Sequence, residues 1–349
     1  MFRAKTVLVV GAGASTEVGL PMGHDLLKRL VKLTHITFEY HRQKTGDPEI
    51  VEALRIILNE GQEVEIINQY IKAGWQLSES SKQAISIDNV IDALEDDKIE
   101  LIGKLGILRS IHKAEFESQA FRCESPDKDD INIENFEQSW YSSLTKLLTE
   151  GVKRSDIGKI FQNIEIINFN YDRCLEHYLP ISLGKYYGIS PNDFRRIMNS
   201  LVIHRPYGVA GRLPWQKGDL PSVPFGQCSP AHLAQVVQQI RTFTERVEEG
   251  AVLSEIKKSI SQSDRIIFLG FAFHRQNVQI LSQEVQDHTE VVATAYGISK
   301  SDKFVIANEL SKAFNFQGNF NEHRIDLADM TCHQFFKEYW LTLTAGVQM

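Results

Sequence analysis

The first thirty residues place a strand, a glycine-rich turn and a helix in direct succession, and this order strongly constrains the fold. Residues 6–10 read TVLVV, an apolar and β-branched run typical of a strand that is buried on both faces. Small residues follow from Gly11 to Ser15, and an amphipathic segment begins near Met22. Such a turn lets backbone N–H groups approach a pyrophosphate closely. Because Thr16 stands where G-x-G-x-x-G has its third glycine, the stretch predicts either a nucleotide site or a tight turn without a ligand.

The composition narrows the class of protein. The chain has 349 residues, of which 42% are hydrophobic and 24% charged, as in ordinary globular proteins. A net charge of -7 argues against direct nucleic-acid binding by the chain as a whole. We expect no membrane segment and no signal peptide, and therefore a cytoplasmic protein. The four cysteines are widely spaced and form no C-x-x-C pair, which predicts reduced thiols and no metal site.

Four further apolar runs predict strands, and helical spacing recurs between them. The runs cover residues 164–167, 201–203, 265–269 and 291–295, and the last helices are expected over 231–247, 252–260, 277–286, 301–313 and 328–343. Alternating strands and helices imply a mostly parallel sheet with helices on both faces. We therefore predict an α/β fold built on a doubly wound, mostly parallel, Rossmann-like sheet.

Residues 35–150 differ from the rest of the chain. Apolar residues recur there three and four positions apart, and no convincing strand is found. We predict that this block is a helical insertion domain, and that residues 1–34 and 151–349 together form the Rossmann-like domain. Within the block we expect a helix over 90–110 and an exposed loop over 124–130, which reads ESPDKDD.

Chemically suggestive residues follow all five predicted strands. In the order of the strands they are Gly11, Asn170, His204, Gly270 and Tyr296. Because the carboxyl ends of parallel strands meet at one edge of a sheet, we expect these residues to share a ligand site. Taken singly, each has an ordinary structural explanation. Asn170 suits a turn, Asp172 a helix N-cap and His204 a hydrogen-bonded core position.

Four segments, in the same order along the chain, resemble the sirtuin superfamily. They are GAGAS at 11–15 with Gly19-Leu20-Pro21, then Asn170-Tyr171-Asp172, then His204 with Gly208, and finally LGFAF at 269–273 with Asn277. The sirtuin motifs that they resemble are GAGxS with G-[IL]-P, Asn-x-Asp, His-Gly and LGxS. The match covers about half of the chain.

The chain also departs from the sirtuin deacylases. It lacks the two C-x-x-C pairs of the zinc module that forms one wall of their acyl-lysine cleft. Residues 22–24 read MGH where those enzymes have D-F-R, and three residues separate His204 from Gly208. Without the zinc module and with a helical insertion, the pattern is most similar to the bacterial sirtuin-like NAD-degrading effectors of anti-phage defence.

This resemblance implies cleavage of the nicotinamide–ribose bond of NAD+, which gives nicotinamide and ADP-ribose, with NAD as the substrate and no metal. Asn170 would hold the ribose or the attacking water, Asp172 would orient Asn170, and His204 would act as the base, because imidazole titrates near neutral pH. The residues expected to contact the dinucleotide are Gly11, Ala12, Gly13, Ser15, Gly270, Phe271, Asn277 and Tyr296.

The resemblance also implies partners. Effectors of this type form homo-oligomers, and a hexameric ATPase of the DNA-translocase type is the partner that it suggests. Other functions of the same site stay open: an NAD-dependent deacylase or ADP-ribosyltransferase, which needs an acceptor groove, or a non-catalytic sensor of NAD or ADP-ribose. A hydride-transfer dehydrogenase is disfavoured. Its ribose-binding acid would end a second strand about 20 residues beyond the glycines, where this chain is expected to be helical.

Overall fold

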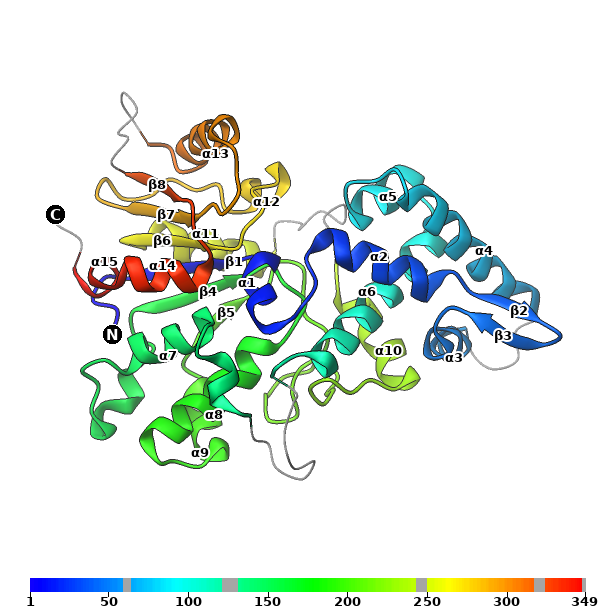
Figure 1. Cartoon of the computed structure of the whole chain (residues 1–349), viewed down its shortest axis with the longest axis horizontal. Helices are drawn as coiled ribbons and strands as arrows, with labels where there is room; N and C mark the ends of the chain where they lie inside the picture. Colours follow the sequence, from blue (N-terminus) through cyan, green and yellow to red (C-terminus); the bar gives the residue numbers. More distant parts are fainter. Residues whose placement is uncertain (59–63, 121–130, 243–249, 317–323, 347–349) are drawn as a thin grey trace.

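The computed structural model describes residues 1–58, 64–120, 131–242, 250–316 and 324–346. Within these residues, six parallel strands form one sheet (Figure 1). They are β1 (Thr6–Val10), β4 (Ile164–Asn168), β5 (Val202–His204), β6 (Arg265–Leu269), β7 (Glu290–Thr294) and β8 (Ile325–Ala328). The order across the sheet is β5-β4-β1-β6-β7-β8. Counted along the chain this order is 3-2-1-4-5-6, which is compatible with a Rossmann-like fold and reverses direction between β1 and β6.

Helices cover both faces of the sheet. One face packs on α7 (Trp140–Thr149), α8 (Cys174–Tyr187), α9 (Pro191–Met198), α14 (Cys332–Glu338) and α15 (Trp340–Thr344), and the other on α11 (Ala251–Ser261), α12 (Arg275–Ile280) and α13 (Lys300–Ala313). Strand β1 explains this arrangement, because successive side chains of a strand point to opposite faces. Leu8 and Val10 pack in the first cluster, and Val7 and Val9 in the second. The apolar run is therefore buried on both sides, as its sequence predicts.

A second group of helices lies to the right of the sheet in Figure 1 and has a hydrophobic cluster of its own. It contains α2 (Gly23–Thr34), α3 (Pro48–Ile57), α4 (Val64–Ser81), α5 (Ile87–Leu94), α6 (Asp97–Glu117) and α10 (Pro230–Val236). Helices α2 and α10 lie outside the predicted insertion, whereas α7 lies within it and packs on the sheet. The domain boundaries at residues 34 and 150 stay a prediction.

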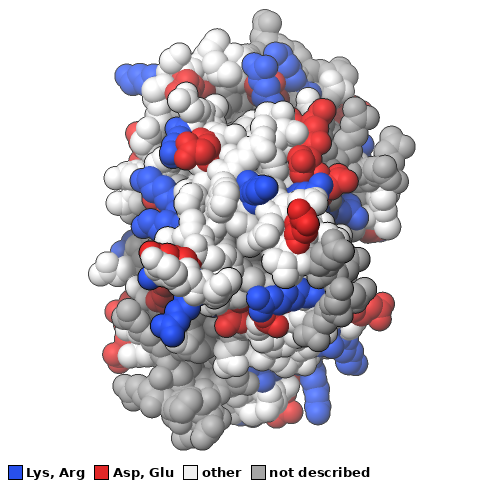
Figure 2. Space-filling view, turned by 90° about the vertical axis from the view of Figure 1, so that its right-hand side faces the viewer, with Lys and Arg blue, Asp and Glu red and all other residues white. Residues whose placement is uncertain are grey.

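Short helices complete the described chain. Helix α1 (Ala12–Ser15) continues into a 3-10 turn, and further 3-10 turns cover Ile133–Phe136, Arg154–Lys159 and Val237–Gln239. None of the described helices is both long and apolar enough to cross a bilayer. Figure 2 shows the face at the right-hand end of Figure 1, where acidic and basic side chains are interspersed.

Two predictions within residues 35–150 were wrong. The block contains a hairpin of β2 (Thr37–Glu39) and β3 (Arg42–Thr45), which the sequence hides because its residues are mostly polar. The helix expected over 90–110 is two helices, α5 and α6. Glu95 adopts a left-handed conformation that ends α5, and the Asp96 carboxylate accepts the N–H groups that start α6.

The end of the chain also differs from the prediction. A sixth strand, β8, precedes the expected final helix, and the helix itself is divided into α14 and α15. Ala328 is the last residue of β8, and Thr331 starts α14 through reciprocal hydrogen bonds with Gln334. The expected loop over 124–130, Cys123 and the end of the expected helix over 231–247 lie outside the described residues.

Candidate functional site

The turns that follow β1 and β6 touch each other through glycine backbone. Gly13 N–H donates to the carbonyl oxygen of Gly270 over 2.9 Å. A Cβ atom on Gly11 would lie 2.6 Å from that same oxygen, and one on Gly270, whose φ is +56°, would lie 2.0 Å from the nitrogen of Ala14. Side chains are therefore excluded from these three glycine positions. This contact also means that the Gly13 N–H is already hydrogen-bonded within the protein.

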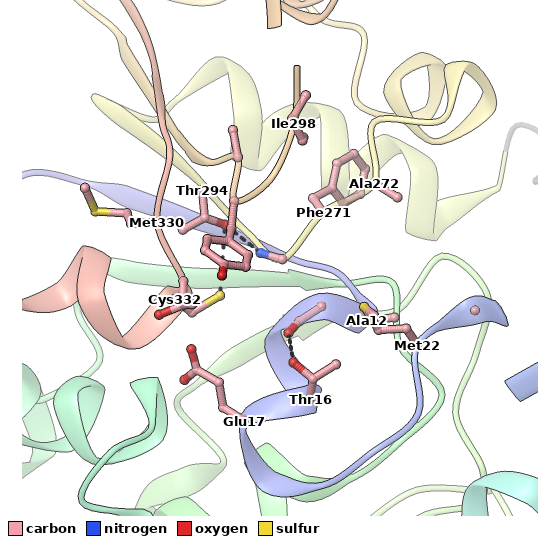
Figure 3. Close-up of a pocket in the computed structure, with 16 residues that line it drawn as sticks. Ala12, Thr16, Glu17, Met22, Phe271, Ala272, Thr294, Ile298, Met330 and Cys332 are labelled. Carbon is pink, nitrogen blue, oxygen red and sulfur yellow. Dashed lines mark hydrogen bonds between the residues drawn. The ribbon is translucent and has the colours of Figure 1, made fainter. Parts of the chain in front are cut away.

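A pocket of about 330 Å³ opens beside this contact, at the carboxyl ends of β1, β6 and β7 (Figure 3). Its described lining is Ala12, Gly13, Thr16, Glu17, Met22, Gly23, Gly270, Phe271, Ala272, Thr294, Ala295, Tyr296, Ile298, Met330, Thr331 and Cys332. The crevice where the strand order of an open α/β sheet reverses is the usual ligand position in such folds. Of the predicted dinucleotide contacts, the pocket brings together Ala12, Gly13, Gly270, Phe271 and Tyr296. Gly11, Ser15 and Asn277 do not line it.

Asn170 lies next to the glycine turn, on the side of β4. Its Nδ2 donates to the carbonyl oxygen of Gly11 and to Ser15 Oγ, each over 3.0 Å. A carbonyl oxygen can only accept a hydrogen bond, so this contact fixes which end of the amide faces Gly11. Within the described chain, no residue donates to Asn170 Oδ1. The amide is therefore held by its nitrogen while its oxygen can accept a further hydrogen bond.

Asp172 continues the same hydrogen-bonded chain. One carboxylate oxygen accepts from Ser15 Oγ over 2.8 Å, and the other accepts the backbone N–H of Cys174 at the start of α8 over 3.1 Å. Burial raises the pKa of Asp172, against the opposing effects of the nearby Arg205 and of the hydrogen bond from Ser15. The N-cap of α8 is Arg173, one residue after the predicted Asp172, and Asp172 instead joins the first N–H of the helix to the glycine turn.

His204 ends the edge strand β5 and faces a different part of the molecule. Its Nε2 lies 3.0 Å from Ser259 Oγ on α11 and 3.6 Å from a carboxylate oxygen of Glu165. Ser259 also donates to Glu165, and the hydrogen bonds from His204 and Ser259 lower the pKa of that carboxylate. His204 does not line the pocket, so the structure does not bring it together with the glycine turn.

Tyr207 is a residue that the sequence reasoning missed. Its hydroxyl donates to the Oδ1 of Asn277, one of the predicted dinucleotide contacts. Its ring packs edge-on against Phe169, which in turn contacts Phe271 of the pocket wall. Burial raises the pKa of Tyr207, so the phenol stays a donor at neutral pH. The signal that could have revealed it is its position directly before Gly208.

Arg205 and Glu17 were also missed. Arg205 donates to the backbone oxygen of Asn170 over 2.6 Å and forms an ion pair with Glu176. Glu17 is the one Asp, Glu, Lys, Arg or His among the described residues of the pocket lining. Burial raises its pKa, while hydrogen bonds from the backbone N–H groups of His333 and Trp140 act in the opposite direction.

The described residues contain no group of three or more His, Cys, Asp and Glu side chains arranged to hold a metal ion. The site is thus a glycine-lined pocket with a hydrogen-bonded Asn170–Ser15–Asp172 chain beside it. No family model matches the sequence, and no curated protein matches it either.

Proposed function

We propose that this protein is an NAD+ glycohydrolase of the sirtuin-like type, which cleaves the nicotinamide–ribose bond and releases nicotinamide and ADP-ribose. The pocket lies where the strand order reverses, and this position supports a dinucleotide because it is the usual ligand crevice of open α/β sheets. The apolar side chains of Met22, Phe271 and Ile298 on its wall suit the adenosine half.

The hydrogen bonds of Asn170 are the observation on which the proposal rests. Its Nδ2 is fixed on Gly11 and Ser15, and its Oδ1 has no donor among the described residues. A ribose hydroxyl or a water molecule next to the glycine turn could donate to this oxygen. Asn170 would thus position either the sugar or the nucleophile, which is the main task that this reaction sets.

The chemistry makes few demands on the protein. Cleavage passes through an oxocarbenium-like transition state, as in glycoside hydrolysis. Nicotinamide leaves as a neutral molecule, so its departure needs no acid. The protein has to hold the ribose, admit one water molecule and accept a proton from it.

We assign the proton-accepting role to His204, as the sirtuin-like pattern implies. Its imidazole now contacts Ser259 and Glu165, so this role requires the ring to leave Ser259 when substrate binds. Asp172 acts through Ser15 and Asn170 as a positioning residue. We further propose that the protein works in the cytoplasm as an anti-phage effector, in a homo-oligomer with a hexameric ATPase of the DNA-translocase type.

The test is chromatography of NAD+ after incubation with the purified chain. The variant is Asn170→Ala, and the matched control is Asn163→Ala, at the opposite end of β4, where Asn163 Nδ2 donates to the backbone oxygen of Phe2. We expect nicotinamide and ADP-ribose from the wild type and the control but not from Asn170→Ala. Full turnover by Asn170→Ala would refute the assignment of the site. NAD+ bound without any turnover would favour a sensor, or an enzyme that needs its partner.

A further inference from the structure

Two helix starts hold the carboxylate of Glu17 at the wall of the pocket. One oxygen accepts the backbone N–H of Trp140, in the first turn of α7, over 2.7 Å, and the other accepts that of His333, in the first turn of α14, over 2.8 Å. If Glu17 turned away, both N–H groups would lose their acceptor. Figure 3 shows Glu17 below Cys332, with its carboxylate directed toward that residue.

The described lining offers no cation to balance this carboxylate. Apart from Glu17, it consists of apolar, glycine and uncharged polar residues. An anionic group held directly beside Glu17 would therefore face a negative charge in a partly buried place, where charge repulsion is poorly screened. An uncharged hydroxyl or amino group would instead donate a hydrogen bond, because a carboxylate has about four lone-pair positions.

We infer that Glu17 makes the pocket selective for NAD+ over NADP+, which carries an additional phosphate on the adenosine ribose. This inference rests on the proposed NAD+ site. Dinucleotide-binding folds commonly select the free ribose hydroxyl with an acid at the end of their second strand. Here helix α2 (Gly23–Thr34) follows the glycine turn instead, and Glu17 supplies an acid from the turn itself.

The experiment is calorimetric titration of the full chain with NAD+ and with NADP+. The variant is Glu17→Gln, and the control is Glu255→Gln, which removes an exposed carboxylate on α11 that pairs with Lys258. We expect the wild type and the control to bind NADP+ about tenfold more weakly than NAD+, or weaker still. In Glu17→Gln, the ratio of the affinity for NAD+ to that for NADP+ should fall to about threefold or less.

Glutamine cannot accept both N–H groups equally well, so Glu17→Gln could fail to fold. A second variant therefore leaves Glu17 in place and adds a cation to the lining, Ile298→Lys. It should raise the affinity for NADP+ more than that for NAD+.

The outcomes separate this inference from the proposed function. Equal affinity of the wild type for NAD+ and NADP+ would overturn the selectivity and leave the NAD+ site standing. An unchanged preference for NAD+ over NADP+ in folded Glu17→Gln would overturn the role of Glu17. An unchanged preference in Ile298→Lys would overturn the premise that the uncompensated negative charge of the lining sets the preference. If the wild type bound neither dinucleotide nor ADP-ribose, the proposed function and this inference would both be wrong.

Discussion

Ser15 and Asp172 are joined by a 2.8 Å hydrogen bond, although they lie 157 positions apart along the chain. The bond links the helix that follows the β1 turn to the segment that follows β4. Because Ser15 Oγ also accepts from Asn170, the three side chains form one hydrogen-bonded chain that ends on the carbonyl oxygen of Gly11. The candidate catalytic asparagine is therefore held on the glycine turn both directly, through the Gly11 carbonyl oxygen, and through the Ser15 hydroxyl group.

Removal of this hydroxyl should affect both stability and activity. In Ser15→Ala, the buried Asp172 loses a donor and Asn170 loses an acceptor, so we expect the free energy of unfolding to fall by about 1–3 kcal/mol. Cleavage of NAD+ should fall with it. Ser182→Ala is the matched control, because Ser182 is also buried but bonds only to the neutral hydroxyls of Thr145 and Tyr178. Urea titration gives the free energy of unfolding of both variants. A Ser15→Ala protein as stable as the wild type would contradict the expectation.

The proposed base can be tested by comparing His204, the last residue of β5, with Tyr207, three residues later. We expect His204→Ala to abolish NAD+ cleavage and to leave NAD+ affinity nearly unchanged. Tyr207→Phe should weaken NAD+ binding instead, because it releases Asn277. Ser259→Ala is the control for the His204 contact and should retain turnover. The measurements are turnover and calorimetric affinity on the same preparations. An active His204→Ala together with an inactive Tyr207→Phe would move the chemistry from the imidazole to the phenol.

A buried ion pair joins α6 to the start of α8. Arg173 and Glu115 are both almost fully buried, and Glu115 also accepts the backbone N–H of Gly226. Glu115→Ala would leave the arginine charge buried without its partner, so we expect a loss of about 3–5 kcal/mol in unfolding free energy. Glu117→Ala, on the same helix and paired with the exposed Arg29, should cost about 1 kcal/mol at most. Equal losses of unfolding free energy for Glu115→Ala and Glu117→Ala, measured by denaturant titration, would contradict this expectation.

His112 makes the stability depend on pH. Burial lowers its pKa to about 4, with a further contribution from the charge of Arg173, whereas a histidine in the unfolded chain titrates near 6.5. Between these values the unfolded chain binds the proton and the folded chain does not. The free energy of unfolding should therefore fall as the pH drops from about 6.5 toward 4, by about 3 kcal/mol in total from this residue.

The matched variant is His112→Gln, whose amide can still donate to the carbonyl oxygen of Ala210, as His112 does over 2.9 Å. Urea unfolding at a series of pH values should give a shallower slope for this variant over the same range. A slope identical to that of the wild type would exclude His112 as its source.

Elements with a strong local pattern could be predicted from the sequence. Strands β1 and β6 agree with the predicted bounds because each is a continuous apolar run, buried at every position. Strand β8 was missed because it has only four residues, of which Ile325 and Leu327 are partly buried and Asp326 is exposed. Its identity depends on pairing with β7, and local sequence does not contain that information.

In the candidate site too, local sequence predicts local features but not contacts between distant segments. The turn positions of the glycines and the place of Asn170 and Asp172 between β4 and α8 could be predicted, because turns and helix starts have local signatures, whereas their contacts with a ligand stay a prediction. The direction of His204 could not, because a strand alternates its side chains between two faces and only packing decides which face meets α11. Glu17 was inaccessible to sequence reasoning for a similar reason. The groups that fix it, on Trp140 and His333, come 123 and 316 residues later in the chain.

The glycine contact between the β1 and β6 turns also determines how this region can evolve. Gly11, Gly13 and Gly270 lie so close together that an alanine at any one of them collides with backbone atoms of the opposite turn. No neighbouring side chain can make room, because the obstructing atoms are themselves main chain. In a library of variants, we therefore expect each of these three positions to tolerate only glycine. Substitutions elsewhere should not restore tolerance unless they change the spacing of the two strands.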